Sequence, residues 1–189
     1  MSISPAVILS FTAFIAVISW LSWNLTLDAW WQPTDRQTAF RMLELLDLQP
    51  GEVVYDLGCG DGRLVIQAVR DFDLEAVGIE IDPVRVIIAR LRILAGGVSP
   101  DAGVIAGDMY KEDLSGADGI LLFLSGEANE KLGPKFDREL EAGTRIVSYY
   151  HELPNWSPIH EEENSKGYPI YLYEVKGREE RASRAAGSN

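Results

Sequence analysis

The chain has 189 residues, of which 47% are hydrophobic and 24% are charged, so it can form one well-buried domain but is too short for two. Lys and Arg number 17 against 29 Asp and Glu, and the resulting net charge of -12 disfavours nucleic acid as the main partner. Several arginines between Arg85 and Arg92 could form a local basic groove, although a solvated helix face explains them more simply. The single cysteine, Cys59, excludes an internal disulfide and a cysteine-cluster metal site, and we expect no metal.

The first 27 residues carry no charged side chain. Their apolar run is about as long as a helix that crosses the hydrocarbon core of a bilayer. Four of the five tryptophans, which favour membrane interfaces, lie at its downstream end: Trp20, Trp23, Trp30 and Trp31. We therefore expect residues 1–31 to be a single-pass transmembrane anchor with an interfacial linker. Arg36 and Arg41 follow the span and no basic residue precedes it, so the catalytic domain should face the cytoplasm. A cleaved signal peptide and a buried amphipathic helix are the alternatives.

From residue 34 onward, helical patterns alternate with short apolar runs. The expected helices are 34–48, 63–72, 83–94 and about 129–140, and the expected strands are 53–55, 76–79, 103–106, 119–124, 144–149 and 168–175. This alternation predicts an α/β protein with a Rossmann-like, doubly wound, mostly parallel sheet. Pro169 makes the last strand suitable for a sheet edge, where it could run antiparallel. We assign residues 32–176 to this domain and expect residues 177–189 to be a disordered tail.

The segment Asp56-Leu57-Gly58-Cys59-Gly60-Asp61-Gly62 lies between an expected strand and an expected helix. Its glycines would let a ligand approach the backbone beside a helix N-terminus. A dinucleotide fingerprint needs a small residue where this chain has Arg63, so that interpretation fails. A tight turn that binds no ligand is the simpler alternative.

An acidic residue before the glycines suits S-adenosylmethionine, which carries a cationic sulfonium and an ammonium group. Asp56 and also Asp61 could lie near its methionine part, and Glu80 ends the next strand, where a carboxylate can accept both ribose hydroxyls. Asp108 follows the third strand, where its carboxylate can accept the adenine amino group and the backbone of Met109 can meet the ring. The expected cofactor-binding residues are Asp56, Gly58, Cys59, Gly60, Asp61, Gly62, Glu80, Ile81, Asp108 and Met109.

On residues 53–63, 78–82 and Gly107-Asp108, the chain resembles the class I, seven-stranded S-adenosylmethionine-dependent methyltransferases. Within that class it is similar to the ATP synthase c-subunit lysine methyltransferase family and its archaeal and bacterial relatives. The features shared with this narrower group are the N-terminal span, Pro33-Thr34, 56–65, Glu80, 138–148 and Pro154-Asn155-Trp156. The resemblance implies methyl transfer to the side-chain amine of lysine in a protein.

In this class the acceptor pocket lies beyond the fourth strand, here at residues 125–129, and the chain lacks the Asn-Pro-Pro-Tyr type of motif found there in many amine and base methyltransferases. Candidates for shaping an acceptor channel, for which packing is an equal explanation, are Ser125, Glu127, Tyr149, Tyr150 and His151. Thr34 could close over the cofactor, with helix capping as the simpler role. The sequence identifies no catalytic base.

Three functions remain open at this stage. The first is a membrane-tethered protein-lysine methyltransferase, and the second is a methyltransferase for a lipid or quinone. The third is a cofactor-binding scaffold that has lost catalysis. The acids at Asp56, Glu80 and Asp108 favour cofactor binding in all three cases, so they do not distinguish between them.

Overall fold

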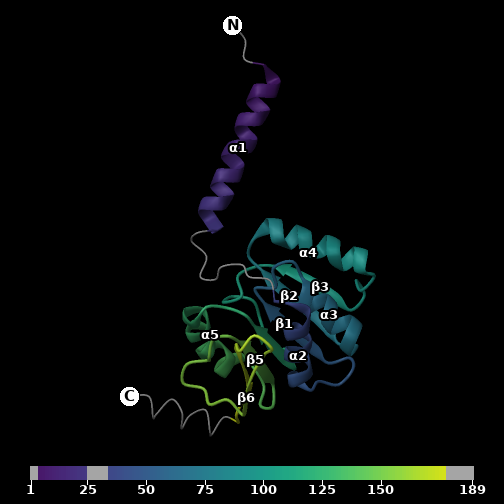
Figure 1. Cartoon of the computed structure of the whole chain (residues 1–189), viewed down its shortest axis with the longest axis vertical. Helices are drawn as coiled ribbons and strands as arrows, with labels where there is room; N and C mark the ends of the chain where they lie inside the picture. Colours follow the sequence, from purple (N-terminus) through teal and green to yellow (C-terminus); the bar gives the residue numbers. More distant parts are fainter. Residues whose placement is uncertain (1–3, 25–33, 178–189) are drawn as a thin grey trace.

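The computed structural model of the chain describes residues 4–24 and 34–177. Within these ranges the chain forms five helices and seven strands, one strand more than the sequence pattern predicts (Figure 1). The helices are α1 (Pro5–Asn24), α2 (Arg36–Leu46), α3 (Arg63–Phe72), α4 (Pro83–Gly96) and α5 (Gly126–Glu139). The strands are β1 (Val53–Leu57), β2 (Glu75–Glu80), β3 (Ala102–Ala106), β4 (Gly119–Leu122), β5 (Arg145–Tyr149), β6 (His160–Glu163) and β7 (Pro169–Glu174).

The strands form a single sheet in the order β3-β2-β1-β4-β5-β7-β6. Strands β1 to β5 run parallel to one another, and β7 runs antiparallel to both β5 and β6. The predicted mostly parallel sheet is therefore confirmed. The expected edge position of the last strand is wrong, because β6 covers β7. The pattern missed β6 because its sequence, His-Glu-Glu-Glu, is polar throughout and carries no apolar signal.

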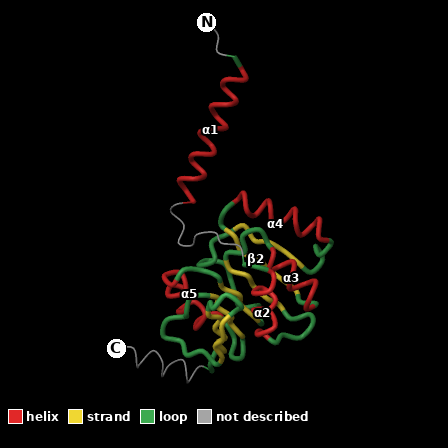
Figure 2. Tube along the Cα trace, in the orientation of Figure 1, coloured by secondary structure: helices red, strands yellow, loops and turns green. Residues whose placement is uncertain are grey.

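Helices cover both faces of the sheet, which gives two hydrophobic cores (Figure 2). One core joins the apolar sides of α2 and α3 to strand residues such as Leu121, and the other joins α5 to strand residues such as Ile120 and Leu122. Successive residues of β4 thus point to opposite faces, and because both faces are covered its four residues are all buried.

Polar residues fix where the helices begin. Asp35 caps α2 by accepting the amide of Thr38, and Asp82 caps α4, where Pro83 follows at the first helical position. Ser125 caps α5 by accepting the amide of Ala128 at 3.1 Å. The N-cap of α2 is therefore Asp35 and not Thr34, for which capping was the simpler expectation.

The predicted transmembrane anchor is wrong, and so is the single-pass membrane localisation that depended on it. Across residues 4–24 and 34–177, no helix combines the length and the apolar character that crossing a membrane requires. The 20 residues of α1 include a proline, an asparagine, three serines and a threonine. The indole nitrogen of Trp20 lies 3.1 Å from both carboxylate oxygens of Asp82, so this ring has a protein partner in place of the expected membrane interface. Trp30, Trp31 and the expected tail from 178 to 189 lie outside the described residues.

Candidate active site

The candidate site lies at the point in the sheet where the strand order reverses. From β1 the chain proceeds to β2 and β3 on one side, whereas β4 and β5 lie on the other side of β1. At such a switch point the connecting segments diverge and leave a crevice at the carboxyl ends of the strands, where α/β proteins bind ligands. The loop that contains Gly58, Gly60 and Gly62 follows β1 at this point and leads into α3.

All three glycines of the loop have a left-handed backbone, with φ of 77° at Gly58, 56° at Gly60 and 73° at Gly62. This region strongly favours glycine, so the spacing of one glycine at every second position has a direct conformational cause. Space is also limited, because a Cβ at Gly58 would lie 3.0 Å from the side chain of Leu124. The amides of Gly58 and Cys59 both donate to the carbonyl of Ile79, which fastens the loop to β2.

Gly78 on β2 must also be a glycine, and we expect Gly78→Ala to lower the free energy of unfolding by about 1–3 kcal/mol. An added Cβ would lie 2.5 Å from Sγ and 2.8 Å from Cβ of the buried Cys59, so the glycine loop would have to shift. The measurement is urea unfolding, with Gly103→Ala on β3 as the control because nothing lies within 4 Å of its added Cβ. Equal stability of the two variants would contradict the proposed packing.

Asp56 and Glu80 bring two carboxyl groups into the buried part of the site, where their exposed fractions are 7% and 4%. Burial, followed by the charges of Glu80 and Asp61, raises the pKa of Asp56 from 3.8 to about 7. No hydrogen bond offsets this effect at Asp56 within the described residues. Burial also raises the pKa of Glu80, although its carboxylate accepts the amides of Gly60 and Asp82, each at 2.9 Å. Glu80 therefore anchors the glycine loop through the amide of Gly60, and its carboxylate also faces the site.

Asp61 has a different role from the one expected of it. Its carboxylate accepts two hydrogen bonds from Arg63, at 2.9 and 2.8 Å, and pairs with Arg92 on α4. Burial alone would raise the pKa of Asp61, but the bonds and charges of these arginines outweigh it and lower the pKa. This carboxylate therefore links the loop to the helix layer, which leaves Asp56 as the acid of the loop that is available to a cationic ligand.

The third strand brings its predicted residues to the same edge of the sheet. Asp108 accepts the amide of Tyr110 at 3.0 Å and pairs with Lys111 at 2.9 Å. Burial would raise the pKa of Asp108, but these two partners lower it, so the carboxylate is ionised at neutral pH. Met109 packs on the core beside α5, and Ile81 is 44% exposed after Glu80.

These groups fit S-adenosylmethionine. The left-handed glycines leave a backbone surface that a Cβ would obstruct, and the unpaired, buried carboxyl of Asp56 suits a positively charged ligand. Glu80 uses one lone pair of each oxygen on the protein, and a carboxylate has about four acceptor positions, so it can still accept hydroxyl groups. The roles of the individual residues remain a proposal, which the substitutions described below test.

Beyond β4, a buried asparagine organises the other side of the site. Asn129 is fully buried, and its side-chain amide nitrogen lies 3.0–3.1 Å from the hydroxyl of Ser148 and the carbonyls of His151 and Glu152. The Ser148 hydroxyl also donates to the carbonyl of His151 at 2.5 Å. Asn129 thereby fixes the turn that follows β5. From the sequence, Asn129 was expected only to end the segment 125–129 and to begin a helix, because nothing local marks a contact across about 20 residues.

The turn after β5 carries a group of aromatic rings. The ring centroids of Tyr150 and His151 are 4.8 Å apart, those of Tyr150 and Tyr168 are 5.4 Å apart, and those of Tyr149 and Phe123 are 4.6 Å apart. Tyr150 has φ of 76° and is 46% exposed, so a strained backbone holds its ring at the surface. Rings thus gather around this turn, and the part of Tyr149, Tyr150 and His151 in an acceptor channel stays a prediction.

The other two channel candidates have structural partners. Ser125 is the N-cap of α5, and Glu127 is 70% exposed and pairs with Lys131 at 3.0 Å. Sequence analysis missed Asn164, whose side chain donates to the hydroxyls of Tyr149 and Thr38 at 3.0 and 3.1 Å. It thereby ties the turn between β6 and β7 to β5 and α2. The only sign of this residue in the sequence was its position in a polar turn.

A seven-stranded sheet with β7 antiparallel, a glycine loop at the switch point and buried acids at the ends of β1 and β2 define an S-adenosylmethionine-dependent methyltransferase of class I. The model of the family described as the ANTKMT methyltransferase domain matches residues 56–160, and the chain belongs to this family. The cofactor is S-adenosylmethionine, because the chain belongs to a methyltransferase family and a similar structure, 36% identical, holds S-adenosyl-L-homocysteine.

Several relatives are similar over most of this domain. A protein-lysine N-methyltransferase of Saccharolobus islandicus (strain REY15A) is 39% identical over 147 residues, which cover 76% of this chain and 91% of that protein. The adenine nucleotide translocase lysine N-methyltransferase of Mus musculus is 36% identical, with 62% of this chain and 51% of that protein covered. The chain thus spans about half of this longer relative. A crystal structure described as an RNA methyltransferase from Salinibacter ruber has a TM-score of 0.75 and 36% identity, and covers 78% of this chain and 95% of that one.

Proposed function

We propose that the chain transfers the methyl group of S-adenosylmethionine to the side-chain amine of lysine in a protein substrate. The group of aromatic rings after β5 is the structural observation that carries this proposal, because the faces of such rings attract an ammonium group. The name of the Saccharolobus islandicus relative, a protein-lysine N-methyltransferase, supports the same acceptor.

The aromatic rings lie at the same edge of the sheet as the glycine loop. Leu57 pairs with Leu122 in the sheet, and Leu122 pairs with Ser148, so the residues that follow β1, β4 and β5 emerge side by side. The side chain of Leu124 lies directly against Gly58, which places the start of the turn before α5 on the cofactor loop. An acceptor held by the rings would therefore be next to the cofactor.

When bound, S-adenosylmethionine supplies an electrophilic methyl group, so the chain itself must align the acceptor and exclude water. A lysine must lose its proton before it can accept the methyl group. Burial among rings lowers the pKa of a lysine and so favours the neutral amine. Burial raises the pKa of the Tyr149 hydroxyl, even though Asn164 donates to it, so this tyrosine stays protonated at neutral pH and is not the base.

The substrate class can be tested with the purified full chain and methyl-labelled cofactor, incubated separately with protein, RNA and lipid fractions of a cell extract. We expect label on lysine in the protein fraction and none after Asp56→Asn. Label confined to RNA, as the description of the Salinibacter ruber protein would suggest, or confined to lipid would overturn the proposal. The net charge of -12 also argues against RNA.

Tyr150→Ala should raise KM for the protein acceptor by about 10-fold, because a desolvated cation–π contact contributes roughly 1–2 kcal/mol. Tyr150→Phe keeps the ring and should stay within about twofold of the wild type. Neither change should alter the affinity for S-adenosylhomocysteine, since Tyr150 lies in the turn after β5 and not in the glycine loop. If the alanine variant changed cofactor affinity and left KM unchanged, the assignment of this ring to the acceptor would be wrong.

A further inference from the structure

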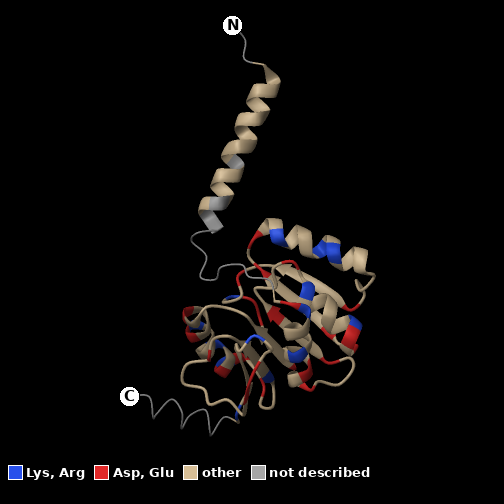
Figure 3. Cartoon of the chain, viewed as in Figure 1, with Lys and Arg blue, Asp and Glu red and all other residues tan. Residues whose placement is uncertain are grey.

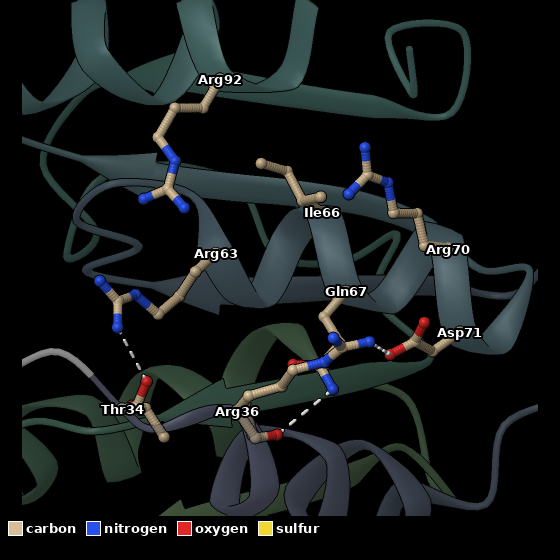
Figure 4. Close-up of a pocket in the computed structure, with 9 residues that line it drawn as sticks. Thr34, Arg36, Arg63, Ile66, Gln67, Arg70, Asp71 and Arg92 are labelled. Atoms are coloured by element: carbon tan, nitrogen blue, oxygen red, sulfur yellow. Dashed lines mark hydrogen bonds and ion pairs between the residues drawn. The ribbon is translucent and has the colours of Figure 1, made fainter. Parts of the chain in front are cut away.

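A second concave site lies outside the crevice at the carboxyl ends of the strands. It is a pocket of about 340 Å³ over α3, bordered by α2 and α4. Figure 4 shows Arg92 extending from α4 toward Arg63 on α3, while Arg36 reaches from α2 toward Asp71. Arg70, about two turns further along α3, lines the same pocket. Four guanidinium groups from three helices therefore converge on one space.

The charges around this pocket do not cancel. Arg36 lies 3.6 Å from Asp71, and Asp61 pairs with both Arg63 and Arg92. Four arginines against these two aspartates leave a formal charge of +2. This local excess occurs in a chain of net charge -12, and Figure 3 shows basic residues and no acidic residue along α4. The pocket therefore attracts an anion, in contrast to the molecule as a whole.

The arginines retain capacity to bind a ligand. The Arg36 side chain is 85% exposed, and Arg70 donates through one terminal nitrogen to the carbonyl of Gly96 at 2.7 Å. A guanidinium has five N–H donors, so these bonds use only part of what each arginine offers. Ala39 and Ile66 add an apolar portion to the lining, which can contact the uncharged part of a ligand.

We propose that this pocket binds the phosphate group of a small phosphorylated molecule. A single guanidinium group can bind both oxygens of a carboxylate with two parallel hydrogen bonds. Several guanidinium groups that approach from different directions suit a phosphate better, because it has more oxygens and a double negative charge. The volume of about 340 Å³ lies at the lower end of the range for small-molecule sites. This inference is independent of the acceptor proposed above, because the pocket lies over α3 and not at the turn after β5.

The test is calorimetric titration of the purified full chain with pyrophosphate at low ionic strength. We expect saturable binding that Arg36→Glu and Arg70→Glu each weaken by about 10-fold or more. The matched control is Arg138→Glu, which makes the same charge change on α5, on the other face of the sheet. All three variants should bind S-adenosylhomocysteine like the wild type, which shows that they are folded.

Four results would overturn the proposal. The first is the absence of pyrophosphate binding, and the second is an equal loss of affinity in Arg138→Glu, which would indicate a general charge effect. The third is succinate binding as tightly as pyrophosphate, which would exclude a preference for phosphate. Displacement of pyrophosphate by S-adenosylhomocysteine would also contradict it, because the anion would then occupy the cofactor site. None of these outcomes affects the label-transfer test of lysine methylation.

Discussion

Replacing Asp56 with asparagine is expected to weaken S-adenosylmethionine binding by about 100-fold or more. The substitution keeps the shape of the side chain and removes a loop carboxyl that has no arginine partner among residues 4–24 and 34–177, whereas Asp61 pairs with Arg63 and Arg92. Losing one partner of a buried charge pair costs about 3 kcal/mol or more, which corresponds to this change in affinity. Calorimetric titration measures the effect directly.

The same variant should be more stable than the wild type in the absence of cofactor at high pH. The pKa of Asp56 in the folded chain is about 7, above its ordinary value of 3.8. The folded state therefore holds more protons than the unfolded state between pH 3.8 and about 7, and the stability of the wild type falls as pH rises across this range. The difference of about three pKa units corresponds to roughly 4 kcal/mol at most, so Asp56→Asn should gain about 2–4 kcal/mol at pH 8 and less than half of that gain at pH 5.

Urea unfolding at the two pH values provides the comparison, and the gain of the variant should be clearly larger at pH 8 than at pH 5. The same linkage predicts that the wild type binds its cationic cofactor more tightly as pH rises from 6 to 8, because ionised Asp56 is the form that attracts a cation. Asp56→Asn should lose this dependence. A variant that binds the cofactor normally would show that Asp56 does not contact it.

Glu80→Gln should have the opposite effect on stability, although Glu80 is also a buried carboxyl with a raised pKa. Both of its oxygens accept backbone amides, from Gly60 and Asp82. A glutamine offers only one oxygen, so its NH₂ group would face a buried N–H donor, and this unsatisfied pair costs about 1–3 kcal/mol. We expect the free energy of unfolding to fall by about that amount. The cofactor affinity should fall by about 100-fold, because the hydrogen bond that holds Gly60 of the glycine loop is weakened.

The control for this experiment is Glu75→Gln, an exposed residue at the start of the same strand, which should change neither quantity. Urea unfolding and calorimetric titration again supply the measurements. The pair of variants makes a sharp test, since Asp56→Asn and Glu80→Gln remove the same charge from neighbouring sites. Equal signs of their stability changes at pH 8 would show that hydrogen bonding at Glu80 is not what distinguishes them.

Much of the domain could be predicted from the sequence because its signals are local. Apolar runs and helical periodicity located α3, whose expected range of 63–72 matches the structure, and placed the other elements of the parallel sheet within a few residues. The strand β6 could not be found in this way, since its residues are polar and it forms only by pairing with β7. The N-terminal apolar run misled the prediction, because composition alone does not show that Trp20 bonds to Asp82.

By itself the sequence determined the methyl donor: glycines at alternate positions after Asp56, with acids at Glu80 and Asp108, suit S-adenosylmethionine and no dinucleotide. Tertiary structure decided which of these acids is available, because Arg92 comes from a helix about 30 residues away and pairs with Asp61, while Asp56 has no such partner. It also decided the roles of Asn129 and of the four arginines over α3. The physical reason is that backbone preferences depend on residues that are close in the sequence, whereas burial and charge pairing depend on side chains that only folding brings together.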